Sequence, residues 1–314
     1  DFLVKQLLLL NLIDPQVYFV MLSHFKSMRI SSGLAAGLFG LVFVSLGGWW
    51  FTIAVSVIVH LALLEYFRMA KYTGIRPAVK TTITACHLLL ITTQCGIHGG
   101  FFSSVADAVL PLSGAVICGW LLLQPITGSI SDIAASVFGL FYLGFLPSHW
   151  IRLRNLTDIN LTPGIDTLSI HFSEFFTPGM AITFGACFMI VASDIGSYIL
   201  GSKFGNRPLS RISPGKTVEG ALGGALCVMF IGAISGEIFN WKFGYLIGSS
   251  LGVLVALFAL IGDLTESMMK RNAGLKDSGD ALPGHGGILD RIDSYLFTPA
   301  VVYYFVIIVL PLIN

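Results

Sequence analysis

The chain has 314 residues, of which 55% are hydrophobic and 11% charged, with a formal net charge of +1 and a mean hydropathy of +0.83. A soluble domain of this size carries charge on about a quarter of its residues, so this composition excludes an ordinary soluble globular protein. Apolar segments of about 20 residues recur along the chain, and each is long enough to cross a bilayer. We expect an all-α polytopic membrane protein, because helices satisfy their own backbone hydrogen bonds in lipid.

The predicted elements begin with an apolar arm. Residues 1–25 are interrupted by Asp14-Pro15, which predicts an interfacial helix or arm. This arm lacks a basic start followed by a small-residue cleavage site, so no signal peptide is expected. About nine transmembrane helices follow, at residues 31–47, 49–67, 81–97, 104–123, 131–150, 179–200, 218–238, 243–262 and 294–313. The first helix is short, so a re-entrant segment is its alternative.

The distribution of Lys and Arg predicts the orientation. With the N-terminus in the cytoplasm, fifteen of the 18 basic residues fall on the cytoplasmic side, as the positive-inside rule requires. The exceptions are Arg152, Arg154 and Lys242. We expect an integral membrane protein of a bacterial inner membrane, or of an organelle derived from one, with its polar site facing the cytoplasm.

The two halves of the chain differ in character. Residues 1–178, the N-terminal half, hold the arm, the first five helices and a far-side loop at 151–178. These helices are apolar and carry no charged motif. Residues 179–314, the C-terminal half, hold the last four helices and the candidate site motifs. Polar residues there gather in the stretches 192–205, 211–220 and 262–293, which all open on the cytoplasmic side in this orientation.

Carboxylates in these stretches are candidates for metal binding. Asp194 lies inside an apolar span, where a charge costs roughly 2.5–3.5 kcal/mol, so it faces either a structural hydrogen-bond partner or a wet cavity. Asp263 ends the eighth span, and Asp290 and Asp293 are spaced i, i+3 at the start of the ninth. Carboxylates that face phosphates across water are the usual way to hold Mg²⁺. The alternative for the last pair is a solvated helix cap.

Basic residues in the same stretches suit phosphate oxygens. The stretch 211–220 contains "SPGKT", which resembles a P-loop, but position 210 is Ser and no strand precedes it, so we reject that assignment. Lys216 remains either a flexible phosphate-binding residue or a plain positive-inside charge. Acidic and basic residues mixed around the glycines of "PGHGG" favour metal-assisted phosphate chemistry at the membrane surface.

One ordered series of residues carries a family resemblance. It comprises Ser267, Lys270-Arg271, Lys276-Asp277, Pro283-Gly284-His285-Gly286-Gly287 and Asp290-Arg291-x-Asp293. This series resembles the signature of the CDP-diacylglycerol synthase (phosphatidate cytidylyltransferase) family, and "SDIGSYILGSKFG" and "SPGKTVEGALGG" resemble its companion motifs. The match covers residues 192–293. One departure is Gly215, where the family commonly has a second lysine.

The resemblance implies a reaction and a set of site residues. CTP and phosphatidic acid would give CDP-diacylglycerol and pyrophosphate, with Mg²⁺ and a possible second cation as cofactors, and with a homodimer by family analogy. The metal candidates are Asp263 and Asp290, followed by Asp194 and Asp293. The catalytic candidates are Lys216, Lys270, Lys276, His285 and Arg291, and the substrate-binding candidates are Ser213, Lys216, Thr217, Ser267, Arg271, Gly286 and Gly287. His285 either binds a phosphate or caps the turn.

Two other functions are alternatives to cytidylyl transfer. A CDP-alcohol phosphotransferase requires a D-G-x-x-A-R pattern that this sequence lacks. A membrane transporter with Asp194 and Asp263 as coupling carboxylates is the alternative of a different class, and inverted repeats, which would favour it, are not evident. The expected partners are CTP, phosphatidic acid and the bilayer, with no nucleic acid.

Overall fold

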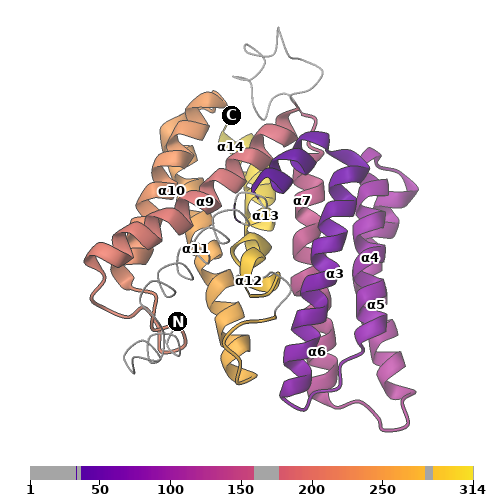
Figure 1. The fold of residues 1–314 in the computed structure, drawn as a ribbon. Helices are drawn as coiled ribbons and strands as arrows, with labels where there is room; N and C mark the ends of the chain where they lie inside the picture. The colour runs from indigo at the N-terminus through magenta and orange to yellow at the C-terminus, as the bar shows by residue number, and fades with distance from the viewer. Residues whose placement is uncertain (1–32, 34–36, 159–176, 280–285, 314) are drawn as a thin grey trace, which may run out of the picture.

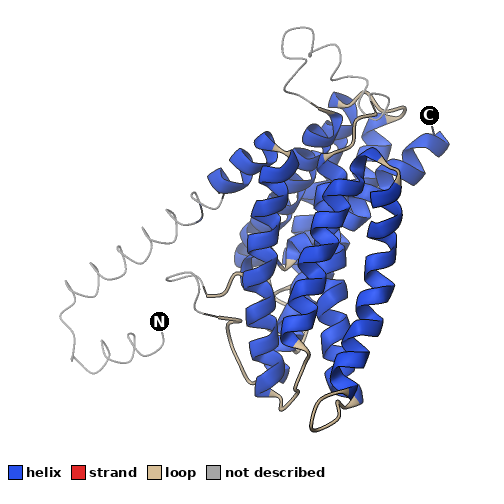
Figure 2. Ribbon diagram, turned by 90° about the vertical axis from the view of Figure 1, so that its right-hand side faces the viewer, coloured by secondary structure: helices blue, strands red, loops and turns tan. Residues whose placement is uncertain are grey.

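The computed structural model describes residues 33, 37–158, 177–279 and 286–313. The predicted N-terminal arm at 1–25, most of the predicted far-side loop at 151–178 and His285 lie outside these residues. Within them the chain is helical, and the helices are joined by loops and turns (Figure 2). An isolated bridge pairs Pro208 with Thr217. The prediction of an all-α protein is confirmed.

The N-terminal half forms a group of neighbouring helices (Figure 1). After a short apolar helix, Gly37–Leu46, the elements are α3 (Gly48–Tyr72), α4 (Val79–Cys95), η1 (Gly96–His98), α5 (Phe101–Leu122), α6 (Ile130–Leu140), the π-helical turn η2 (Phe141–Phe145) and α7 (Leu146–Arg154). The start of α6 is fixed locally, because Ser129 and Asp132 form a reciprocal capping box that satisfies free backbone N–H groups.

The C-terminal half adds three long helices and a segmented last one. These are α9 (Pro178–Phe204), α10 (Val218–Ile238), α11 (Gly244–Asn272), and then α12 (Leu289–Ile292), α13 (Ser294–Tyr304), the π-helical turn η4 (Phe305–Val309) and α14 (Leu310–Ile313). The last four elements together make one membrane-spanning candidate, Leu289–Ile313. The loops from α9 to α10 and from α11 to α12 lie toward the same lower end of the bundle in Figure 1.

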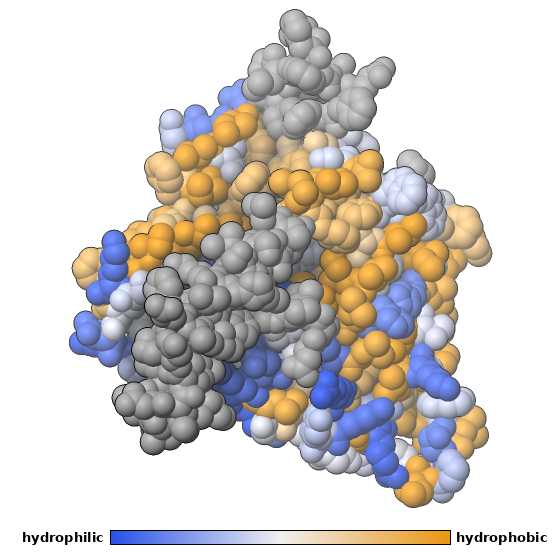
Figure 3. Space-filling model, viewed as in Figure 1, coloured by the Kyte–Doolittle hydropathy of each residue, from blue (hydrophilic) through white to orange (hydrophobic). Residues whose placement is uncertain are grey.

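Seven of the described helices are long and apolar enough to cross a membrane. The predicted count of nine is therefore not confirmed. The segment expected at 81–97 is α4, with 17 residues, and the segment expected at 31–47 contains the short helix Gly37–Leu46. Figure 3 shows apolar side chains over most of the visible face and hydrophilic ones gathering toward its lower end. This distribution agrees with helices that cross a bilayer and expose polar ends.

Glycines allow α10 and α11 to approach each other closely. A Cβ atom at Gly248 would collide with the carbonyl of Gly232, and one at Gly236 would collide with the carbonyl of Gly244. In lipid, the hydrophobic effect does not drive the association of helices. Small residues at such positions instead let two helices come close enough for extensive van der Waals contact. The first turns of α11 are therefore packed tightly against the last turns of α10.

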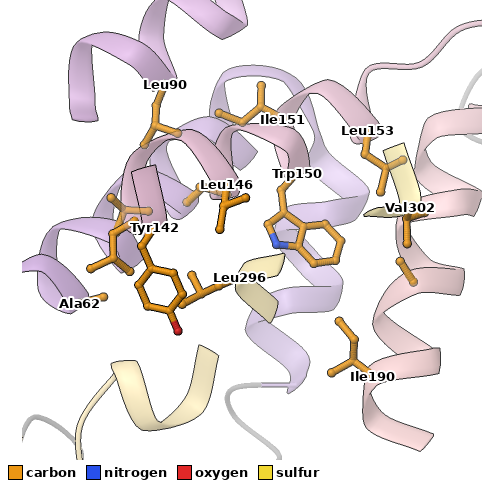
Figure 4. Close-up of a cluster of buried hydrophobic side chains, with 14 of the residues drawn as sticks. Ala62, Leu90, Tyr142, Leu146, Trp150, Ile151, Leu153, Ile190, Leu296 and Val302 are labelled. Atoms are coloured by element: carbon orange, nitrogen blue, oxygen red, sulfur yellow. The ribbon is translucent and has the colours of Figure 1, made fainter. Parts of the chain in front are cut away.

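A buried apolar cluster joins the two halves. Figure 4 shows Tyr142, Leu146 and Trp150 from η2 and α7 facing Leu296 of the last helix, and Ile190 of α9 lies nearby. The Trp150 indole N–H donates to the backbone oxygen of Tyr295 at 3.0 Å. Helices from both sides of residue 178 thus share one core. The division of the chain at that residue stays a prediction from sequence.

Candidate active site

The loop between α9 and α10 presents Lys216 to α11. Its backbone is held by two hydrogen bonds, from the Leu209 N–H to the Lys216 oxygen at 2.7 Å and from the Lys216 N–H to the Ser213 oxygen at 3.1 Å. The Lys216 ammonium forms an ion pair with Asp263. Burial lowers the pKa of Lys216, while the nearby carboxylates of Asp293 and Asp194 act in the opposite direction. Lys216 therefore contacts Asp263 of α11 and lies within the electrostatic influence of Asp293 and Asp194.

A second ion-pair group lies at the C-terminal end of α11. Lys270 Nζ is 2.5 Å from Glu266 Oε2, one helical turn away, and 2.5 Å from Asp290 Oδ1 at the start of the last helix. The Glu266 side chain is fully buried, and neither of its oxygens has a hydrogen bond of good geometry among the described residues. Lys270 is thus the group that compensates this buried charge, and it links α11 to α12.

Asp290 is surrounded by hydrogen-bond donors. Its Oδ2 atom accepts from the Ser278 N–H at 2.9 Å, from the Ser278 hydroxyl at 2.8 Å and from the Gly287 N–H at 2.9 Å. Gly286 has φ +81°, in the left-handed region that side chains disfavour, and a Cβ atom there would lie 3.0 Å from Asp290 Oδ2. The glycines therefore let the backbone fold tightly around this carboxylate.

The other predicted site residues are distributed around these two ion pairs. Asp194 is exposed on α9, and Asp293 accepts the Ser294 N–H at 2.7 Å as the N-cap of α13. Thr217 is the N-cap of α10, since its Oγ1 accepts the Gly220 N–H at 3.1 Å. Arg271 donates to the backbone oxygens of Ile212 and Leu275, and so joins α11 to the Lys216 loop. Ser267 is buried on α11, and Lys276 and Arg291 are exposed.

The acid–base balance of this region fits a bound divalent cation. Asp263, Glu266 and Asp290 pair with Lys216 and Lys270, and Asp194 and Asp293 act electrostatically on Lys216, so carboxylates outnumber lysines. No group of three or more His, Cys, Asp or Glu side chains is placed to hold a metal by itself among the described residues. Mg²⁺ keeps several waters and is usually bound by one or two carboxylates together with substrate phosphates, so the donor set suits Mg²⁺ held jointly with a phosphate ligand.

Sequence reasoning missed Glu65. This glutamate lies on α3 in the N-terminal half, 8% exposed, and contacts Ser278, Ile288 and Leu289 of the C-terminal half. It is the one acidic residue in the segment 49–67. An ionisable residue in an apolar span marks a functional site by default, and this rule, which we applied to Asp194, also applied to Glu65.

The fold and the paired charges define a class of protein: a helical integral membrane protein that carries lysines and carboxylates suited to phosphate chemistry. The cytidylyltransferase family model matches residues 27–309, and the chain belongs to that family. Its relatives include a phosphatidate cytidylyltransferase of Synechocystis sp., 44% identical over 92% of this chain and 99% of the relative. Another is the chloroplastic phosphatidate cytidylyltransferase 5 of Arabidopsis thaliana, 38% identical over 90% of this chain and 72% of the relative.

A third relative, the phosphatidate cytidylyltransferase of Bacillus subtilis, is 30% identical over 88% of this chain and 96% of its own length. Matches of such length cover both halves of the chain, so the resemblance is not confined to the C-terminal motifs. The family expected from residues 192–293 is confirmed, and the transporter alternative has no support from these matches.

Proposed function

We propose that the chain transfers the cytidylyl group of CTP to phosphatidic acid, giving CDP-diacylglycerol and pyrophosphate. The family membership and three relatives of this activity support it. The structural observation that carries it is the convergence of the Lys216–Asp263 and Lys270–Asp290 ion pairs from separate segments. Lysines that already hold carboxylates can exchange them for phosphate oxygens when substrates arrive.

The reaction needs little proton chemistry. A phosphate oxygen of phosphatidic acid attacks the α-phosphorus of CTP, the bond from that phosphorus to the bridging oxygen breaks, and pyrophosphate leaves with the electron pair. The nucleophile is already an anion, so no strong general base is required. The main barrier is the repulsion between two polyanions, which cationic groups fixed in advance reduce. Lys216 and Lys270 are suited to this, and Lys276 and Arg291 remain candidates for further phosphate contacts.

Mg²⁺ is the proposed cofactor. When bound, it supplies neutralisation of phosphate charge and stabilises the leaving group. Asp263 is the first candidate ligand, with Asp194 and Asp293 nearby in the electrostatic surroundings of Lys216. Asp290 stays a candidate, but its oxygens already accept four hydrogen bonds, which supports a role in holding the loop. A second cation and a homodimer stay predictions from the family.

The site serves one substrate in the lipid and one in water. Lys216 and Lys270 lie beside the ends of membrane-spanning helices, so phosphatidic acid can reach them from the bilayer and CTP from the solution. The positive-inside distribution of Lys and Arg favours the cytoplasmic side. Bacterial relatives favour a bacterial inner membrane. Ser213, Thr217, Ser267, Arg271, Gly286 and Gly287 remain the candidates that shape the substrate site.

One assay tests the proposed function. The purified chain in detergent micelles is given radiolabelled CTP, phosphatidic acid and Mg²⁺. We expect label in the lipid extract and an equal molar release of pyrophosphate, both lost when EDTA replaces Mg²⁺. The variant Lys216→Ala combined with Asp263→Asn is the inactive control. Absence of labelled lipid with monodisperse wild-type protein, across several acyl compositions, would rule out the activity.

A further inference from the structure

A buried carboxylate in the N-terminal half holds the loop that carries the candidate catalytic groups. Glu65 lies on α3, 8% exposed, and is the one acidic residue of that helix. Its Oε1 accepts the Ile288 N–H at 2.9 Å, and its Oε2 accepts the Leu289 N–H at 2.8 Å. The Ser278 hydroxyl lies 3.0 Å from Oε2. The carboxylate thus receives donors from both sides of the segment 280–285.

The backbone around Glu65 is shaped to fit it. A Cβ atom at Gly279 would lie 2.7 Å from Glu65 Oε1, and one at Gly287 would collide with Glu65 Oε2 and Ser278 Oγ. The described ion pairs do not include Glu65, so backbone N–H groups and a hydroxyl compensate its charge. Hydrogen bonds to an ionised acceptor are about twice as strong as neutral ones, so these bonds hold residues 278 and 287–289 strongly against α3.

Ser278 and the backbone next to Ile288 also connect Glu65 to the Lys270–Asp290 ion pair. Ser278 Oγ is 2.8 Å from Asp290 Oδ2 as well as 3.0 Å from Glu65 Oε2, and its one proton serves either carboxylate. The Gly287 N–H, next to the Ile288 N–H, donates to Asp290 at 2.9 Å. Asp290 in turn holds Lys270 at 2.5 Å. A displacement of this backbone would therefore move both Asp290 and Lys270.

We propose that Glu65 is a positioning residue for cytidylyl transfer: from α3 it fixes residues 278–279 and 286–289, and thereby the direction of Asp290 and Lys270. This inference rests on the proposed function, because Lys270 is a phosphate-binding candidate of that reaction. Glu65 touches no substrate group itself. Loss of Glu65 should slow the chemical step, since a misplacement of a reacting or binding group by about 1 Å can lower the rate on the order of a hundredfold.

The first test compares two glutamates that accept backbone N–H groups. Glu237 accepts the Tyr245 N–H at 3.1 Å between α10 and α11, far along α11 from Lys270, and is the matched control. Glu65→Gln keeps the shape of the side chain but replaces one acceptor oxygen by a donor. We expect kcat to fall at least about tenfold in Glu65→Gln, with the KM for phosphatidic acid within about twofold. Glu237→Gln should leave both constants unchanged.

A double-mutant cycle separates positioning from general destabilisation. Ser278→Ala removes the hydroxyl that lies between Glu65 and Asp290. If both act through the same loop, the double variant loses no more kcat than the worse single variant, because their effects are coupled. Multiplied losses in the double variant, or an unchanged kcat in folded Glu65→Gln, would overturn the inference. Ser278→Ala also gives a milder change if Glu65→Gln does not fold.

A second readout does not depend on turnover. Amide hydrogen exchange at Ile288 and Leu289 should become roughly tenfold faster or more in Glu65→Gln, because each amide loses a charge-assisted acceptor. The Glu237→Gln protein should exchange at the wild-type rate there. Unchanged exchange at both amides contradicts the inference even if the wild-type protein proves inactive. An inactive wild-type protein with the expected exchange pattern contradicts the proposed function alone.

Discussion

Lys216, on the loop before α10, forms an ion pair with Asp263 of α11. Both side chains are partly exposed, at 29% and 26%, so the pair itself contributes little to stability. Its interest is chemical, because Lys216 is our proposed phosphate contact and Asp263 our first candidate metal ligand. In the proposed reaction, the substrates and the metal ion would replace this contact.

Replacing Lys216 tests whether it binds phosphate. Lys216→Ala should lower kcat/KM for CTP by about a hundredfold, as for removal of a main charge-stabilising group. Lys203→Ala is the matched control, since Lys203 is exposed in the last turn of α9 and contacts no candidate site residue in the described interactions. Steady-state kinetics in mixed micelles decide the question. Unchanged kcat and KM in Lys216→Ala would leave Lys216 as a charge that only sets the topology.

Asp263 and Asp290 should respond differently to loss of charge. Asp263→Asn should raise the Mg²⁺ concentration needed for half-maximal activity and lower kcat, with little change in thermal stability, because both members of the ion pair are partly exposed. Asp290→Asn should instead lower stability by roughly 1–3 kcal/mol, because the amide loses the charge and keeps only one of the two oxygens that accept from Lys270 and from the Ser278 and Gly287 N–H groups. Mg²⁺ titrations and thermal unfolding in detergent distinguish them. An equal shift in Mg²⁺ dependence for both variants would identify Asp290 as a ligand too.

Arg154 should matter for stability and not for chemistry. Its guanidinium is buried and donates to the Val44 oxygen at 2.6 Å, to the Ser45 oxygen at 3.2 Å and to Thr177 at 2.9 Å. Arg154→Met should therefore cost roughly 1–3 kcal/mol and lower the Tm in detergent, since buried acceptors lose their donor. Asp107→Asn, which alters only an exposed contact to Arg152 at 3.8 Å, is the control. Equal Tm values for both variants would contradict this role.

The orientation can be tested with cysteine labelling. In a cysteine-free background, Asn206→Cys and Asp277→Cys should react with impermeant thiol reagents only in opened cells, and Lys242→Cys should react in intact spheroplasts. All three positions are exposed. Ser278 is unsuitable as a probe because it is 1% exposed and bonded to two carboxylates. Labelling of Asn206→Cys in intact spheroplasts would reverse the proposed topology.

Sequence predicted the class of fold well and the ends of helices less well. The apolar segment expected at 243–262 is the first part of α11, which continues to Asn272. Hydropathy detects only the apolar part of a helix, whereas the backbone continues through polar residues until a Gly or a turn ends it. This extension places Glu266 and Lys270 one turn apart on the same helix.

The charged motifs were also visible in the sequence, because an apolar chain otherwise avoids such residues. Their roles in phosphate chemistry stay predictions. The sequence showed that Arg154 departs from the positive-inside rule but did not explain why. The fold uses the donors of Arg154 to bind backbone oxygens near Gly47, where a Cβ atom would lie 2.8 Å from its guanidinium carbon. Local sequence could not reveal that, since the acceptors come from another segment.

The sequence by itself determined that the chain is a helical membrane protein, where its apolar segments lie and which motifs resemble those of the family. Only the tertiary structure decided that Lys216 meets Asp263, that Lys270 bridges Glu266 and Asp290, and that Glu65 reaches the last loop from α3. The reason is physical. Composition and periodicity act along the chain, whereas a buried charge is satisfied by whichever donors the packing of distant helices brings within about 3 Å.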